Sequence, residues 1–135
     1  MKKVFFVCVH NSGRSQMAEA FARKLGEGMI LAESAGTEPG TELNPQAVLA
    51  MQEIGYDMSS HYPKVMTPEM AESADRIITM GCGVDTGACP AVFVPSEDWG
   101  LDDPKGQPIQ RVREIRDQIK RKVEHLLAEL GNEQR

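Results

Sequence analysis

One cysteine and one arginine lie on either side of a short polar loop near the start of the chain. In the stretch VFFVCVHNSGRSQMAEAF, Cys8 ends an apolar run and Arg14 precedes a helical pattern. A loop between a strand and a helix N-terminus turns several backbone N–H groups toward one point, and the helix dipole adds positive potential there. Arg14 adds a planar, two-pronged donor. We therefore predict a binding site for a tetrahedral oxyanion, formed by Val9, His10, Asn11, Ser12, Gly13 and Arg14.

The thiol of Cys8 adds reactivity to this predicted site. A free thiol with a pKa of ~8.5 is only about 3% thiolate at pH 7, whereas a thiol at a helix N-terminus beside an arginine can be almost fully ionised. Ser15 can donate its hydroxyl group to the same sulfur and lower the pKa further. The nucleotide phosphate loop GxxxxGKS or GxxxxGKT is absent from the sequence. We therefore predict that Cys8 is a nucleophile toward the central atom of a bound oxyanion.

Two further cysteines, Cys82 and Cys89, lie seven positions apart in MGCGVDTGACP. Single cytosolic cysteines are commonly buried as small apolar residues, so core packing is one interpretation. A thiol relay with Cys8 is the other, because a nucleophilic loop is expected at a neighbouring strand end. An odd number of cysteines does not suit a secreted disulfide framework. No metal site is expected, because the cysteines and the three histidines lack zinc-ligand spacing.

Composition excludes several classes of function. The 135 residues suit one domain, residues 1–135, and the net charge of −5 with a pI of about 5.2 disfavours binding to nucleic acid or to an anionic membrane. No apolar run approaches the ~18 residues that span a bilayer, and the N-terminal apolar run is too short for a signal peptide. We expect a cytoplasmic protein, and a monomer because no apolar surface stripe is left over.

Strand and helix patterns alternate along the chain. The predicted strands are residues 3–7, 29–34, 76–80 and 91–94. The predicted helices are residues 15–25, two helices that start at Asn44-Pro45 and Thr67-Pro68, and residues 109–130. The spacing places Leu25 and Ile54, among others, on inward faces. The alternation predicts an α/β fold with a small four-stranded parallel sheet, order 2-1-3-4, and helices on both faces. Cys8 then lies at the switch point, where such sheets bind ligands.

The segments CVHNSGRS, RSQMAEAF, ESAGTE, LNPQAV and WGLDDP resemble the low-molecular-weight protein tyrosine phosphatases and the thioredoxin-coupled arsenate reductases that share their fold. The resemblance extends over nearly the whole chain and implies the phosphatase-like fold. It also implies a general acid at an Asp directly before a Pro, which Asp103 fits, with Asp102 as a less favoured substitute.

Cys82 and Cys89 decide which substrate the resemblance implies. Thiols cannot reduce phosphorus, but arsenic(V) on a thiolate can accept two electrons. The resemblance therefore implies that Cys8 attacks arsenate, Cys82 attacks Cys8 and releases arsenite, and Cys89 attacks Cys82, leaving a disulfide for thioredoxin to reduce. A disulfide needs Cα atoms within ~6.8 Å, whereas seven helical steps span ~10 Å. Any helix over residues 82–89 must therefore unwind, which Gly83 and Gly87 would favour.

Two rival functions are also compatible with this sequence. One is a tyrosine phosphatase, although the late loop lacks the aromatic residues expected around a phosphotyrosine ring. The other is an oxyanion sensor in which Cys8 binds without turnover, although this would not need Asp103 or the other thiols. For the reductase we expect no bound cofactor, thioredoxin as external reductant, phosphate or sulfate as competing oxyanions, and weak phosphatase side activity.

Overall fold

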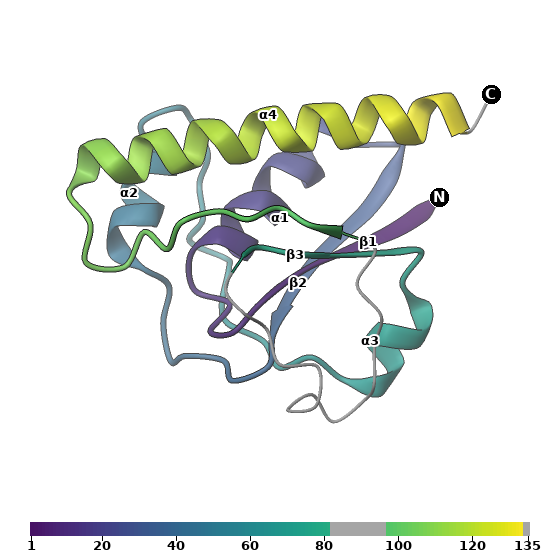
Figure 1. Ribbon diagram of the computed structural model, residues 1–135, viewed down its shortest axis with the longest axis horizontal. Coiled ribbons are helices and arrows are strands. Elements are labelled where there is room, and N and C mark those ends of the chain that lie inside the picture. Colours follow the sequence, from purple (N-terminus) through teal and green to yellow (C-terminus); the bar gives the residue numbers. More distant parts are fainter. Residues whose placement is uncertain (82–96, 134–135) are drawn as a thin grey trace.

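The computed structural model describes residues 1–81 and 97–133, and its sheet has the predicted topology (Figure 1). The four strands are β1 (Lys2–Cys8), β2 (Ile30–Gly36), β3 (Arg76–Thr79) and β4 (Glu97–Asp98). All neighbouring strands are parallel, and their order is β2-β1-β3-β4. The predicted α/β fold with strand order 2-1-3-4 is therefore confirmed. The strand expected at residues 91–94 lies outside the described residues, and the described β4 comes just after it.

Helices cover both faces of the sheet (Figure 1). They are α1 (Arg14–Leu25), α2 (Pro45–Gln52), α3 (Pro68–Ser73) and α4 (Ile109–Glu133). The start of α2 follows from its sequence. The Asn44 side chain accepts hydrogen bonds from two backbone N–H groups of the first turn, and Pro45 has no N–H that would be left without a partner at the first helical position. Thr67 and Pro68 start α3 in the same way.

Alternation along β1 explains why two layers of helices are needed. Val4 and Phe6 face a core that includes α1 and α4, whereas Phe5 and Val7 face a smaller core beside α3. All four are fully buried. Helices on both sides of a parallel sheet bury both faces of its strands, and strand pairing places β1 between β2 and β3. Cys8, its last residue, therefore emerges between two neighbouring strand ends.

Two residues predicted to face inward are exposed. Leu25 is 41% exposed and Ile54 is 37% exposed. Leu25 ends α1, and it is the adjacent Gly26 that approaches α4, where an added Cβ would lie 2.9 Å from Leu127 Cδ2. For Ile54, α2 ends at Gln52 and the chain tightens into a turn, in which Ile54 N donates to Met51 O. Helical periodicity therefore no longer decides which way Ile54 points.

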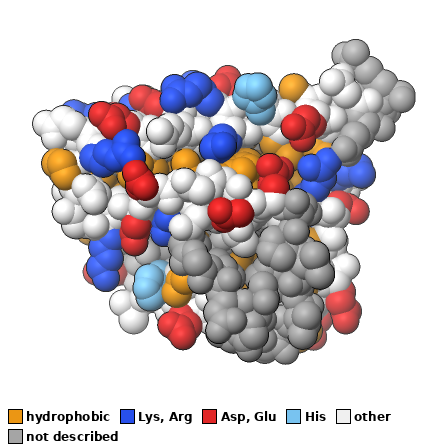
Figure 2. Space-filling view, in the orientation of Figure 1, with side chains coloured by type: hydrophobic (Ala, Val, Ile, Leu, Met, Phe, Trp, Pro, Cys, Tyr) orange, Lys and Arg blue, Asp and Glu red, His pale blue; other side chains and the backbone are white. Residues whose placement is uncertain are grey.

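The outer side of α4 is charged, as its sequence predicts. Figure 2 shows acidic and basic side chains intermixed along this helix, at the top of the view. Its buried stripe runs through Val112, Ile115, Ile119, Val123 and Leu130. Among the described residues, no helix is long and apolar enough to cross a membrane.

Candidate active site

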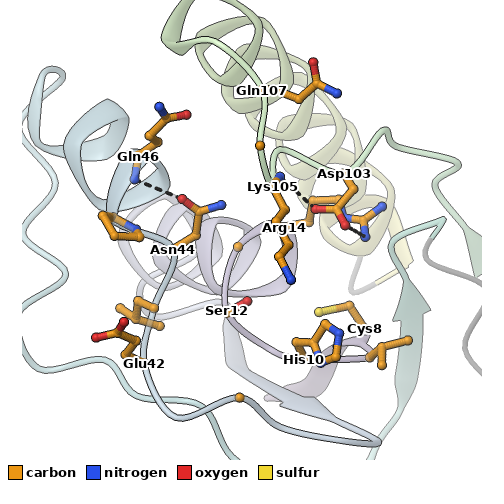
Figure 3. Close-up of a pocket in the computed structure, with 16 residues that line it drawn as sticks. Cys8, His10, Ser12, Arg14, Glu42, Asn44, Gln46, Asp103, Lys105 and Gln107 are labelled. Atoms are coloured by element: carbon orange, nitrogen blue, oxygen red, sulfur yellow. Dashed lines mark hydrogen bonds and ion pairs between the residues drawn. The ribbon is translucent and has the colours of Figure 1, made fainter.

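The loop after β1 forms the floor of a pocket of about 730 Å³. Figure 3 shows Cys8, His10, Ser12 and Arg14 gathered around it, with Asp103 and Lys105 reaching in from the loop before α4. Five of the six residues predicted to bind the oxyanion, all except the fully buried Asn11, thus line one cavity with the predicted general acid, although about 90 residues of sequence separate them. Strand order is the reason, because the ends of β1, β3 and β4 meet at one edge of the sheet.

The loop carbonyls bond to groups outside the loop. The donors are backbone N–H groups of the segment after β2, in four bonds: Thr37 N to Cys8 O (3.2 Å), Glu38 N to Val9 O (2.8 Å), Gly40 N to His10 O (2.9 Å) and Asn44 N to Ser12 O (2.8 Å). The N–H and C=O groups of a planar trans peptide point in opposite directions. Outward carbonyls therefore turn the loop N–H groups inward, as an anion site requires.

Gly36 allows this segment to lie so close to the loop. A Cβ at Gly36 would lie 2.6 Å from Val9 O and 3.0 Å from Asn11 Cβ. Any larger residue would push the loop away from the end of β2. The glycine at this position is therefore required by close backbone approach.

The Cys8 sulfur is buried and faces two hydrogen-bonding groups. Asn11 N donates to it at 3.1 Å, and Ser15 Oγ lies 2.9 Å from it. Asn11 Nδ2 also donates to Ser15 Oγ at 2.8 Å, so the Ser15 hydroxyl hydrogen can point to the sulfur. Hydrogen bonds to a charged form stabilise that form. The arrangement suits a thiolate.

The guanidinium of Arg14 is held in place by backbone oxygens. Its Nη1 donates to Met80 O at 3.2 Å and to Leu101 O at 2.7 Å, at the ends of β3 and of the segment after β4. Its Nη2 lies 3.9 Å from Asp103 Oδ2. The charge is thus fixed beside the loop, where it can bind an oxyanion.

The structure separates the two candidate acids. Asp103 lines the pocket, its side chain is 58% exposed, and its Oδ1 accepts a hydrogen bond from Lys105 N at 2.9 Å. Asp102 instead pairs with Arg111 on α4. Only Asp103 is therefore placed to meet an ion bound at Cys8.

Cys82 and Cys89, together with Gly83 and Gly87, lie outside the described residues. Before them, the chain is described as far as Gly81, two residues beyond Thr79, where β3 ends beside β1. Gly81 has a φ of 80°, and its N–H donates to Asp98 Oδ1 at 2.7 Å. The residue before Cys82 is thus anchored at the same edge of the sheet as Cys8.

Sequence reasoning missed residues on both sides of the loop. In front, the Lys105 side chain extends into the pocket (Figure 3). The only sequence signal for Lys105 is its place two residues after Asp103, which does not tell where the ammonium group points. Behind the loop, Gln16 and His61 bond to each other and are largely buried. Neither belongs to a recognisable motif.

A buried carboxylate anchors the region behind the loop. Glu19, 2% exposed, accepts a hydrogen bond from Ser34 Oγ at 3.0 Å and lies 3.0 Å from His61 Nδ1 and 3.5 Å from Lys64 Nζ. Burial alone raises the pKa of Glu19. The hydrogen bond from His61 and the charges of Lys64 and Arg23 outweigh it, so the pKa lies below its usual 4.5. Glu19 is therefore ionised and paired at neutral pH. The described residues hold no cluster of three or more metal-binding side chains.

The fold and the site together define a class: α/β proteins with a cysteine at the end of a central parallel strand, inside an anion-binding loop closed by an arginine. The sequence matches the low molecular weight phosphotyrosine protein phosphatase family over residues 3–135. The chain belongs to this family.

Individual relatives are arsenate reductases. The chain is 42% identical to the glutaredoxin arsenate reductase of Synechocystis sp., over 97% of this chain and 100% of that protein. It is similar to a solved arsenate reductase in the phosphate-binding state, with 42% identity, a TM-score of 0.84, and coverage of 96% and 99% of the two chains. The thioredoxin-dependent arsenate reductase of Corynebacterium glutamicum has 31% identity and a TM-score of 0.80. That match covers 98% of this chain and 63% of the other.

Proposed function

We propose that this protein reduces arsenate to arsenite, with Cys8 as the nucleophile and Cys82 and Cys89 as the relay thiols. The observation that carries the proposal is the environment of the Cys8 sulfur. It lies inside an anion loop with outward carbonyls and faces Asn11 N and Ser15 Oγ. The arsenate reductases among the relatives support arsenate over other oxyanions.

The first step is an exchange at arsenic. The loop N–H groups and Arg14 hold arsenate, and the Cys8 thiolate attacks the arsenic atom. A sulfur–arsenic bond forms and an arsenic–oxygen bond breaks. Asp103 gives a proton to the departing oxygen, which leaves as water. The oxidation state of arsenic does not change in this step.

Reduction follows at sulfur. The Cys82 thiolate attacks the Cys8 sulfur, the sulfur–arsenic bond breaks, and its electron pair remains on arsenic, which leaves as arsenite. The product is a Cys8–Cys82 disulfide. Cys89 then attacks Cys82, which restores the Cys8 thiolate and leaves a Cys82–Cys89 disulfide. Two thiols are oxidised for each arsenic reduced by two electrons, and an external dithiol must close the cycle.

We propose thioredoxin as that external reductant, in a cytoplasmic, monomeric enzyme without a bound cofactor. The thioredoxin-dependent relative supports this choice. The glutaredoxin arsenate reductase among the relatives points to the alternative. Both reductants can deliver two electrons to a disulfide, so the proposed steps at arsenic are compatible with either.

A phosphotyrosine phosphatase is the second candidate, because the family and the loop are shared. The described residues that line the pocket include no Phe, Tyr or Trp, so apart from the imidazole of His10 they offer no aromatic ring to a phosphotyrosine. We therefore expect only weak hydrolysis of small phosphate esters.

The test measures NADPH oxidation in the presence of arsenate, thioredoxin and thioredoxin reductase, and in parallel with glutaredoxin, glutathione and glutathione reductase. Wild type is compared with Cys89→Ser, and both are assayed with p-nitrophenyl phosphate. The proposal expects arsenate-dependent turnover in wild type that Cys89→Ser loses, while ester hydrolysis survives. Brisk ester hydrolysis without arsenate turnover would show a phosphatase instead. Turnover with glutaredoxin alone would reassign the reductant.

A further inference from the structure

Gln16 is a fully buried amide in the first turn of α1, and four partners surround it. Its Nε2 lies within hydrogen-bonding distance of Asn11 O (3.1 Å), Asn11 Oδ1 (3.0 Å) and Tyr62 O (2.9 Å). Its Oε1 lies 3.0 Å from His61 Nδ1. The amide therefore joins the oxyanion loop to the segment that runs behind it.

Asn11 is the loop residue that most needs such support. Among the described residues other than glycine, it alone has a positive φ, of 52°. A left-handed backbone costs an L-residue about 1 kcal/mol or more, and it persists only where the surroundings enforce it. The carbonyls of Cys8, Val9, His10 and Ser12 are held by backbone N–H groups of residues 37–44. The carbonyl of Asn11 is held by the Gln16 side chain.

The conformation of Asn11 matters because two of its N–H donors support the nucleophile, one directly and one through Ser15. Its backbone N–H donates to Cys8 Sγ at 3.1 Å. Its Nδ2 donates to Ser15 Oγ, which itself lies 2.9 Å from the sulfur. Gln16 Nε2 binds both the backbone oxygen and the side-chain oxygen of Asn11. Gln16 thus holds the carbonyl of Asn11, and it shares the side-chain oxygen with Lys64 N, which donates to Asn11 Oδ1 at 2.8 Å.

We propose that Gln16 is a positioning residue, which holds Asn11 so that its two donors face the Cys8 sulfur and keep it reactive. This inference rests on the proposed role of Cys8 as nucleophile. Gln16 itself touches neither the sulfur nor the pocket, since its contacts are to Asn11, Tyr62 and His61.

His61 sets the orientation of the Gln16 amide. Its Nδ1 lies 3.0 Å from Gln16 Oε1 and 3.0 Å from Glu19 Oε2, and both oxygens only accept hydrogen bonds. Nδ1 must therefore carry the proton. A flipped Gln16 amide would set N–H against N–H at His61 and oxygen against oxygen at Asn11. The buried pair Glu19 and His61 thus selects the orientation that points Nε2 to the loop.

The experiment uses the full chain with Cys82→Ser and Cys89→Ser, so that Cys8 is the only thiol. Thiolate absorbance and the rate of iodoacetamide alkylation are followed against pH, without arsenate or reductant. Gln16→Met keeps a similar volume and loses the amide. Gln16→Leu also loses the amide and, like methionine, adds no charge near the Cys8 sulfur. Gln110→Met, at an exposed position of α4, is the matched control.

We expect both Gln16 variants to raise the apparent pKa of Cys8 by about one unit or more, which is about a tenfold loss of thiolate below the pKa. The Gln110→Met profile should match the parent. Folding is checked by circular dichroism, and Gln16→Leu decides the matter if Gln16→Met does not fold. A folded Gln16 variant with the parent's Cys8 profile would overturn the inference. Arsenate turnover plays no part in this readout, so failure of the proposed reductase activity would be seen separately.

Discussion

Removing the Lys64 ammonium group should destabilise the protein in a pH-dependent way. Lys64 Nζ lies 3.5 Å from Glu19 Oε1, and the two side chains are 21% and 2% exposed. Lys64→Met keeps most of the aliphatic chain and removes the charge. The buried carboxylate then keeps Ser34, His61 and the more distant Arg23 as partners. The variant therefore tests how much of the support behind the active-site loop is electrostatic.

The magnitude follows from the distance and the burial. Two unit charges 3.5 Å apart attract by about 5 kcal/mol at an effective dielectric constant of about 20. Methionine saves the cost of desolvating the lysine, and the remaining partners still stabilise the carboxylate. We therefore expect a net loss of about 1–3 kcal/mol, below the ~3–5 kcal/mol typical of breaking a fully buried pair. For a chain of 135 residues, this is a fall in Tm of about 3–10 °C.

The pKa of Glu19 sets the pH dependence. In the folded wild type it lies below the usual 4.5. The stability that Glu19 contributes is therefore present above about pH 4.5 and is lost as the pH falls through the folded-state pKa. Without Lys64, burial acts against fewer favourable charges, so the carboxylate of the variant takes up its proton at a higher pH. The difference in stability between wild type and variant should be largest near neutral pH and shrink in acid.

Thermal unfolding of both proteins, followed by circular dichroism from about pH 7 down to about pH 3.5, measures this difference. Lys24→Met is the matched control. Lys24 Nζ lies 4.4 Å from the Tyr56 ring centroid and Lys64 Nζ lies 5.3 Å from that of Tyr62, so both variants lose a ring contact. A Tm loss for Lys64→Met that stays constant across this pH range, or that Lys24→Met reproduces, would refute the electrostatic account.

Two predictions concern the pocket. Asp103→Asn should lower kcat for arsenate reduction by about 10²–10⁴-fold, the usual contribution of a general acid. Asp102→Asn should leave kcat nearly unchanged, because that carboxylate pairs with Arg111. Steady-state kinetics of both variants test this, and equal losses of kcat would contradict the assignment of Asp103. Lys105→Met should raise KM for arsenate severalfold with little change in kcat. The effect should be clearest at low salt, because ions screen an exposed ammonium group. A wild-type KM that does not respond to salt would contradict a role of Lys105 in binding arsenate.

Much of the fold follows from local patterns. The apolar run before Cys8, the caps at Asn44 and Thr67 and the stripe of α4 predicted elements that the structure contains. Parallel strands joined by helices leave few possible strand orders, so sheet order 2-1-3-4 could be predicted as well. The end of α1 at Leu25 was predicted correctly. The inward placement of Leu25 and Ile54 was wrong, because periodicity does not tell where a helix stops packing against the core.

The sequence by itself was enough to predict the reactive loop of this protein. A cysteine, a loop, an arginine and a serine follow one another within eight residues, and local backbone geometry suffices to bring such near neighbours together. Only the tertiary structure decided what supports and completes the site. It places Asp103 and Lys105 in the pocket, pairs Asp102 with Arg111, and sets Gln16 against His61, 45 residues away. Contacts between distant segments depend on how the whole chain packs, and no local pattern records them.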